Sequence, residues 1–194
     1  MLFCLVLLSA VIGGGGQTPG PRIESGHGTC RLVMPKAMWA ALERHAPGFT
    51  PFRFEQYAPH LFRRGPGWHY EVTERQAPFA VVGDFNGDKI KDVVVNGCTR
   101  RSCGPVAVLS QGKRFVASDV APGAEQAPEY PRPGDYPLED VLRLVPPSVV
   151  HSPHLEPKPL VLKTDAVEEI YFEKAAAIYY FTGDRYFATY ATSD

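Results

Sequence analysis

The sequence has almost no net charge, and this shortage limits which partners the protein can have. Its 20 Lys and Arg residues nearly balance its 21 Asp and Glu residues, so the formal net charge is −1. A chain without a positive excess has no general electrostatic attraction for nucleic acid or for acidic membrane surfaces, and we expect no nucleic-acid partner. With 194 residues, of which 44% are hydrophobic, the chain is long enough for one domain with its own core.

Long hydrophobic runs are scarce as well. The apolar run at residues 2–12 has the length of a secretory h-region and is too short to span a membrane. No Lys or Arg precedes it, which departs from the usual leader. We expect a signal peptide at residues 1–16, a flexible linker at 17–28 and a single β-rich domain at 29–194. The sequence thus predicts an exported protein, periplasmic or extracellular, without stable membrane insertion once the leader is removed.

Cysteines are few, and removal of the leader leaves three of them. Cys98 and Cys103 flank the four residues TRRS in a loop between two expected strands. In an oxidising compartment these two cysteines can form a local disulfide, and the alternative is that both remain thiols. Cys30 could compete for either partner. No second Cys or His pair stands at ligand spacing, which argues against a zinc site.

Proline and glycine are abundant, with 19 and 18 residues, and this favours a loop-rich β protein. Residues 35–45 form the best helix, because Met34, Met38, Ala41, Leu42 and His45 recur at helical spacing. Residues 138–145 are ambiguous between strand and helix. We expect an α+β, mainly β fold, in which an antiparallel meander carries the helix on one face. The expected strands are 68–73, 79–82, 92–96, 106–110, 114–117, 160–163, 169–172, 176–181 and 186–190.

The two halves of the chain resemble each other. VLSQGKRFVAS at residues 108–118 aligns without gaps with YYFTGDRYFAT at 179–189, and PFAVVGD at 78–84 echoes PLVLKTD at 159–165. This predicts an internal repeat at 78–118 and 159–190, made of two blade-like four-strand units. The alternative is that β-hairpins resemble one another. Because two blades cannot close a propeller, we expect one antiparallel sheet or two packed sheets.

One stretch stands out chemically, FAVVGDFNGDKIKDVVVNG at residues 79–97. Two apolar runs enclose a loop with oxygen-bearing side chains at alternate positions, and the main-chain carbonyl of Ile90 adds another oxygen. Ca²⁺ takes six to eight oxygen ligands, which such a loop can direct at one point. An EF-hand is excluded, because Val95 occupies the place of its bidentate Glu. The alternative is an acidic turn whose side chains only cap the backbone. The candidate metal ligands are Asp84, Asn86, Asp88, Ile90 and Asp92.

The pattern GDFNGD…D between two apolar strands resembles the calcium loop of FG-GAP/VCBS repeat proteins. The resemblance covers residues 79–96 well and the hairpin up to residue 117 loosely, and it implies Ca²⁺ bound within a β-meander. Lys89 departs from it, because the family usually has Gly after the third ligand. In a left-handed conformation Lys costs about 1 kcal/mol more than Gly. Lys89 and Lys91 also bring positive charge to the loop, so we expect weak binding, with a Kd of about 10⁻⁴–10⁻³ M.

Functional motifs are otherwise lacking, because the sequence contains neither a phosphate-binding glycine loop nor a nucleophile elbow. We therefore expect an exported non-catalytic module with one Ca²⁺-binding loop, structural or binding in role, and with a protein or glycan partner that the sequence does not identify. The alternative is a hydrolase in which the acidic loop supports a cleft, with His69 or His154 as the base.

Overall fold

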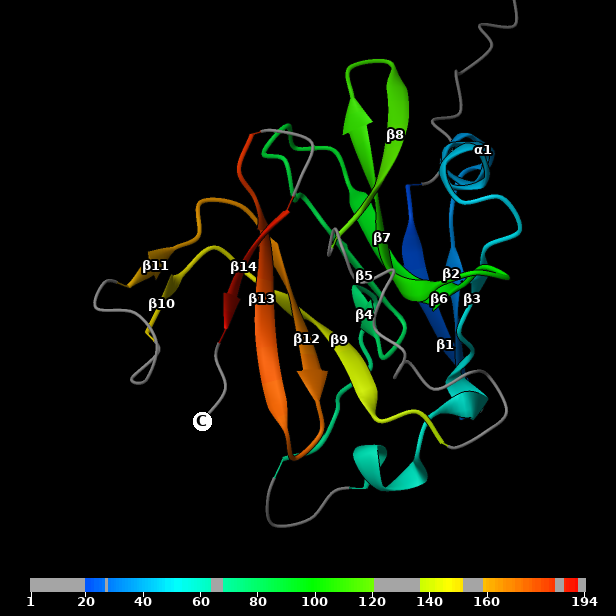
Figure 1. Ribbon diagram of the computed structural model, residues 1–194, viewed down its shortest axis with the longest axis vertical. Coiled ribbons are helices and arrows are strands. Elements are labelled where there is room, and N and C mark those ends of the chain that lie inside the picture. The colour runs from blue at the N-terminus through cyan, green and yellow to red at the C-terminus, as the bar shows by residue number, and fades with distance from the viewer. Residues whose placement is uncertain are drawn as a thin grey trace, which may run out of the picture.

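In the part of the chain that the structure describes, two larger antiparallel sheets, two two-stranded ribbons and one α-helix form the fold (Figure 1). The computed structural model describes residues 20–26, 28–63, 68–120, 137–151, 159–183 and 187–191. The α+β, mainly β class expected from the sequence is confirmed. The predicted signal peptide at residues 1–16 lies outside the described residues. Among the residues that are described, no helix is long and apolar enough to cross a membrane.

The larger sheet has the order β4-β5-β6-β7-β8, and β3 pairs with β6 beside this path. All seven residues of β6 are buried, because both faces of the sheet are covered. A strand covered on both sides needs apolar residues in succession rather than in alternation, which explains the three valines at 93–95. The strands of this sheet are β3 (Thr50–Pro51), β4 (Gln76–Ala77), β5 (Ala80–Gly83), β6 (Asp92–Cys98), β7 (Cys103–Gln111) and β8 (Arg114–Asp119).

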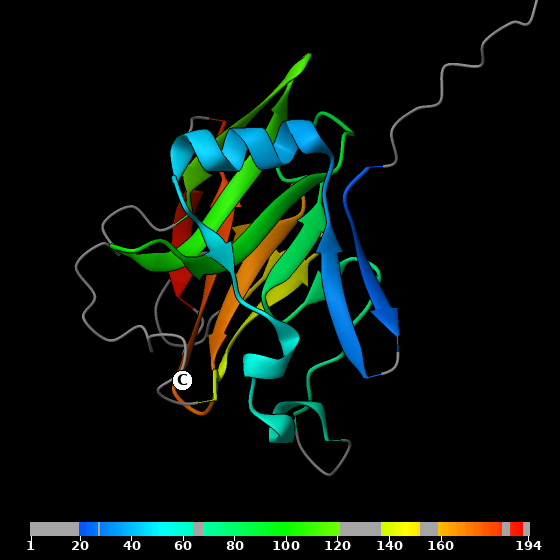
Figure 2. The ribbon, with the colours of Figure 1, turned by 90° about the vertical axis from the view of Figure 1, so that its right-hand side faces the viewer.

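One face of this sheet is covered by α1 (Lys36–His45), which runs across β7 and β8 (Figure 2). The predicted helix is confirmed, and Met38, Ala41 and Leu42 form its buried side. Their core cluster includes Val93 and Val95 of β6. Beside the helix stands the hairpin of β1 (Arg22–Gly26) and β2 (Thr29–Val33), and the 3-10 turns η1 (Phe54–Gln56) and η2 (Pro59–Phe62) follow.

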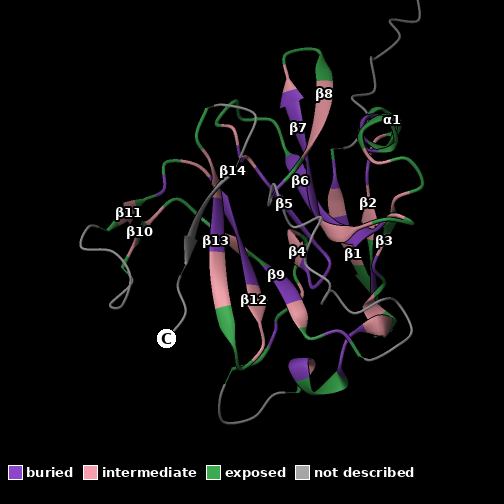
Figure 3. Cartoon of the chain, in the orientation of Figure 1, coloured by how far each residue is buried: buried purple, intermediate pink, exposed green. Residues whose placement is uncertain are grey.

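The opposite face is covered by the smaller sheet, with the order β14-β13-β12-β9. Apolar residues from both sheets form a second core cluster, in which Val81 and Val94 join Leu142 and Val167. Burial is therefore concentrated between the layers (Figure 3). The strands here are β9 (Asp140–Val145), β12 (Ala166–Tyr171), β13 (Ala175–Phe181) and β14 (Phe187–Ala191), and a separate ribbon pairs β10 (Val149–Val150) with β11 (Leu160–Val161).

Three local expectations differ from the structure. Residues 22–26, assigned to a flexible linker, form β1, and Ile23 is buried because β1 pairs with β2. Residues 68–73 are not a strand, since only Tyr70 of this segment is buried and its N–H donates to Leu61 of η2. His45 does not belong to the apolar face of α1, because its ring pairs with Asp119 at the helix end.

The internal repeat is only partly visible in the topology. Both halves contain a meander of three strands, β6-β7-β8 and β12-β13-β14. In the second half, however, β12 pairs with β9 rather than with β11. The registers of the two hairpins also differ. The β7–β8 hairpin ends at the pair Gln111–Arg114, and the β13–β14 hairpin ends at Phe181–Phe187. The ungapped alignment instead matches Gln111 with Thr182. Two four-strand blades therefore stay a prediction.

Candidate functional site

The acidic loop connects two strands in register. Gly83 of β5 pairs with Asp92 of β6, so residues 84–91 leave the sheet and return to it at the same level. Asp84 accepts hydrogen bonds from the Gly87 N–H to Oδ1 at 2.8 Å and from the Lys89 N–H to Oδ2 at 3.0 Å. Such bonds from a side chain to its own loop fix the turn and direct the carboxylate inward.

The next two predicted ligands repeat this arrangement. The Asp88 N–H donates to Asn86 Oδ1 at 3.1 Å, and the Ile90 N–H donates to Asp88 Oδ1 at 2.8 Å. The Nδ2 group of Asn86 also donates to the carbonyl of Ser110 in β7, at 2.6 Å. Ile90 is exposed, and because its side chain is aliphatic, this predicted ligand has only its main-chain carbonyl to offer. The loop is thus built from successive side-chain turns.

Lys89 has φ = +67°, in the left-handed region where a side chain is strained. Glycine adopts this conformation without strain, so Lys89 has a backbone cost that a glycine at the same position would avoid. Gly87 also has a positive φ, of +81°, and a Cβ there would lie 3.1 Å from Thr164 Cγ2. The loop needs left-handed backbone at two places and has a glycine at only one of them.

Asp92 differs from the other acidic residues because it is fully buried. Its Oδ2 accepts from the Phe85 N–H at 3.1 Å and its Oδ1 from the Ser110 N–H at 2.7 Å. Burial raises the pKa of Asp92 to about 6, and the charge of Asp88 acts in the same direction, whereas the bonds from Ser110 and Phe85 oppose the rise. Asp92 therefore joins the loop to the sheet whether or not it also contacts an ion.

Ser110 is the residue that sequence reasoning missed. Its Oγ lies 2.6 Å from Asp88 Oδ2 and 3.0 Å from Asp92 Oδ1, so one hydroxyl bridges two predicted ligands. Ser110 belongs to β7, which lies beside β6. The only signal in the sequence is a polar residue within a buried strand, and that signal does not identify its partner.

The loop also contacts the second sheet. The Asp84 N–H donates to Asp165 Oδ2 at 2.9 Å, and the Thr164 hydroxyl donates to the Phe85 carbonyl at 2.9 Å. Arg75 donates through Nη2 to the same Oδ2 of Asp165 at 2.5 Å. The acidic loop is therefore the place where the β5–β6 connection meets the segment that precedes β12.

The donor set agrees with Ca²⁺ in chemical type. A carboxylate has about four acceptor positions, and Asp84 and Asp88 each use two of them for the hydrogen bonds described, which leaves oxygen lone pairs for an ion. Within the described ranges, no Lys, Arg or His nitrogen lies within 4.0 Å of the carboxylates of Asp84, Asp88 or Asp92. In the same ranges, no three His, Cys, Asp or Glu residues group as ligands for a metal ion. The calcium assignment therefore stays a prediction.

The cysteine prediction is confirmed for one pair. Cys98 and Cys103 form a disulfide between directly paired residues of β6 and β7, with a Cα–Cα distance of 4.0 Å. Cys30 is a buried free thiol. Burial raises the pKa of Cys30 to about 11, and the charge of Glu55 adds to the effect.

The histidines proposed for a hydrolase gain no support from the described part of the chain. His69 is exposed, and none of the ion pairs found there involves it. His154 lies outside the described residues. His45 does meet a carboxylate, Asp119, with Nε2 3.0 Å from Oδ1.

Comparisons with known proteins add no relative to this picture, because no family model, no curated protein and no solved structure matches the chain. The fold and the loop together define a class, a two-sheet β protein with an acidic connection at the junction of its sheets. The resemblance to FG-GAP/VCBS repeats rests on the sequence of residues 79–96 and, loosely, of the hairpin up to residue 117.

Proposed function

We propose that this chain is an exported, non-catalytic β-rich module whose acidic loop binds Ca²⁺ with low affinity. The observation that supports this is the shape of the loop. Asp84, Asn86 and Asp88 are turned inward by hydrogen bonds from the backbone of their own loop, and Lys89 adopts the left-handed conformation in which related loops have glycine. An acidic turn of that shape, without a described cation beside it, is suited to an ion.

The proposed role of the ion is structural. In this proposal a bound Ca²⁺ offsets the repulsion between the carboxylates of Asp88 and Asp92, which both lie within hydrogen-bond distance of the Ser110 hydroxyl. The loop residue Asp84 donates its N–H to Asp165, so an ion that stiffens the loop also stiffens the contact with the second sheet. Calcium therefore stabilises the junction between the sheets in this proposal and takes no part in a reaction.

Export and the partner belong to the same proposal. The apolar leader predicted at residues 1–16 and the disulfide between Cys98 and Cys103 both suit an oxidising compartment outside the cytosol. The proposed partner is a protein or a glycan of the envelope or the extracellular space, with which the module makes a binding or structural contact.

Thermal unfolding of the full chain in EDTA and then in increasing Ca²⁺ tests the metal role. A ligand selective for the folded state stabilises it by RT ln(1 + [L]/Kd), so a Kd of about 1 mM gives about 1.4 kcal/mol at about 10 mM Ca²⁺. We expect the melting temperature to rise with Ca²⁺ and not with Mg²⁺. Asp88→Asn should abolish this rise, whereas Glu74→Gln, an equal change of charge at an exposed residue outside the loop, should preserve it.

If Asp88→Asn lowers the melting temperature by the same amount in EDTA and in Ca²⁺, the carboxylate acts only as a cap for its own loop, and the calcium proposal is wrong.

A further inference from the structure

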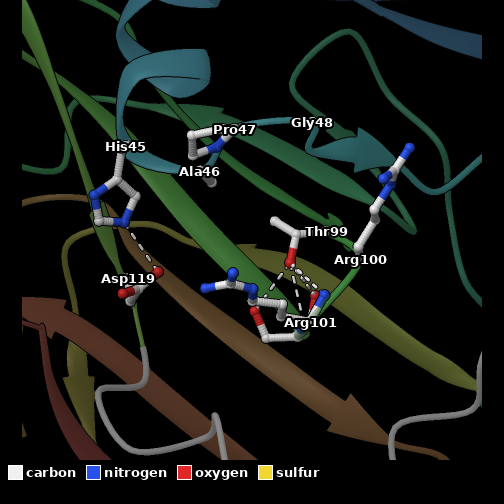
Figure 4. A pocket seen from close by; sticks show the side chains of 9 residues that line it. His45, Ala46, Pro47, Gly48, Thr99, Arg100, Arg101 and Asp119 are labelled. Carbon is white, nitrogen blue, oxygen red and sulfur yellow. Dashed lines mark hydrogen bonds and ion pairs between the residues drawn. The ribbon is translucent and has the colours of Figure 1, made fainter.

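A hollow of about 880 Å³ lies where the end of α1 faces the turn between β6 and β7 (Figure 4). The turn at residues 99–102 forms one side, and the segment from His45 to Gly48 forms another. Asp119, the last residue of β8, completes the lining. Its volume is within the range of pockets that bury a small organic ligand, about 300–1,000 Å³.

The turn that lines the hollow is held in one shape. The disulfide between Cys98 and Cys103 closes its base. Thr99 Oγ1 accepts from the Arg101 N–H at 3.1 Å and from the Ser102 N–H at 3.0 Å, and donates its own proton to the Ser102 carbonyl at 3.2 Å. A ligand that binds here therefore meets a preorganised surface and orders little of the protein.

These hydrogen bonds also argue against a catalytic role for the turn. The proton of the Thr99 hydroxyl is engaged by the Ser102 carbonyl. Ser102 Oγ lies 3.2 Å from Thr99 Oγ1, so the two hydroxyls contact each other. Among the described residues, neither hydroxyl forms a hydrogen bond with His45, the histidine of the lining, whose Nε2 contacts Asp119. The hollow is a candidate for binding rather than for nucleophilic chemistry.

The charge of the lining is positive, in contrast to the chain as a whole. Arg100 and Arg101 contribute two positive charges, and neither forms an ion pair within the described ranges. The one lining carboxylate, Asp119, is held by His45 Nε2 at 3.0 Å. The arginines also differ in direction, because Arg101 extends toward His45 and Asp119 whereas Arg100 points away from them (Figure 4).

We propose that this hollow binds a phosphate or sulfate monoester group, with Arg101 as its principal ligand. A guanidinium presents paired N–H donors that match two oxygens of a tetrahedral oxyanion. Arg101 has no ion partner among the described residues, so its donors are open to such a ligand. In this arrangement the guanidinium of Arg101 binds the oxyanion, and the rest of the hollow accommodates the organic group to which the phosphate or sulfate is esterified. The site is independent of the acidic loop and does not require Ca²⁺.

Calorimetric titration of the full chain tests the proposal, in EDTA and at constant ionic strength set with chloride. The probes are inorganic phosphate, inorganic sulfate, glucose 6-phosphate and glucose 6-sulfate. We expect saturable binding of at least one ester, more tightly than of the corresponding inorganic ion. A preference for one ester identifies which of the two chemical groups the natural ligand carries.

Arg101→Gln should weaken ester binding at least tenfold, whereas the matched variant Arg100→Gln should change it by less than twofold. Both residues are exposed, so both variants should keep the melting temperature of the parent chain. If Arg101→Gln does not fold, Arg101→Lys retains the charge without the planar fork and should still bind several-fold more weakly. The proposal is wrong if no ester binds saturably, if the inorganic ions bind as tightly as the esters, or if the two glutamine variants lose affinity equally.

Discussion

Asp84 and Asp165 are joined by two reciprocal hydrogen bonds, one to the Asp165 carboxylate and one between their main chains. The N–H of Asp84 donates to Asp165 Oδ2 at 2.9 Å, and the N–H of Asp165 donates to the Asp84 carbonyl at 3.1 Å. The close approach requires Gly83, since a Cβ there would lie 2.9 Å from Asp165 Oδ2. These two aspartates end the two segments that resemble each other in the sequence, so the echo at residues 78–84 and 159–165 marks a physical contact between the two sheets.

Asp165→Ala should destabilise the protein through this contact. The substitution leaves the Asp84 N–H and the Arg75 guanidinium without their shared acceptor, which is largely buried at 11% exposure of the Asp165 side chain. We expect a loss of about 2 kcal/mol in the free energy of unfolding, measured by urea denaturation. Asp119→Ala is the control, because that carboxylate is 51% exposed and should cost less than about 1 kcal/mol. Equal losses in the two variants would mean that the junction adds nothing beyond a surface pair.

Lys89→Gly should stabilise the protein, because glycine adopts the left-handed conformation at φ = +67° without strain. The expected gain is about 1 kcal/mol in EDTA, measured by thermal or urea unfolding. If the loop binds Ca²⁺, the variant should also bind it more tightly. Lys91→Gly removes the same charge at a residue without a positive φ, and it should give no gain in EDTA. A gain of similar size at both positions would attribute the effect to charge rather than to backbone strain.

Cys30 should resist alkylation in the folded protein. Its thiol pKa is raised from 9.0 to about 11 because the residue is buried. In a Cys4→Ser variant, we expect iodoacetamide at pH 8.5 to modify Cys30 slowly in buffer and rapidly in urea. The free energy of unfolding also depends on pH, because the thiol of Cys30 loses its proton at lower pH in the unfolded chain than in the folded protein. The contribution of Cys30 to stability is therefore complete below pH 9 and falls as the pH rises from 9 toward 11. Equal rates of alkylation in buffer and in urea would show that the thiol is accessible.

Local sequence signals predicted the parts of the fold that local physics decides. The apolar stripe of α1 and the valines of β6 identified a helix and a strand, because burial on a helix or within a sheet imposes its own spacing. The acidic loop was located correctly between two strands, and the positive φ of Lys89 agrees with the glycine preference of similar loops.

The parts that could not be predicted depend on neighbours distant in the chain. The composition of residues 22–26 predicts a linker, yet pairing with β2 makes them a strand. Ser110 contacts the acidic loop only because β7 lies beside β6. The hollow at Arg101 joins α1, the β6–β7 turn and β8, three elements that no spacing rule brings together.

Reduction of the disulfide between Cys98 and Cys103 should have two separable effects. The bond closes a loop of only six residues, so the loop-entropy relation gives a loss of about 2 kcal/mol in the free energy of unfolding. The Cys98→Ser/Cys103→Ser double variant should show this loss in urea denaturation, whereas Cys98 and Cys103 remain joined in the control variant Cys30→Ser. The same double variant frees the turn that carries Arg101, so its affinity for glucose 6-phosphate or glucose 6-sulfate should fall by at least threefold. An unchanged affinity despite the stability loss would show that the hydrogen bonds of Thr99 alone hold the turn.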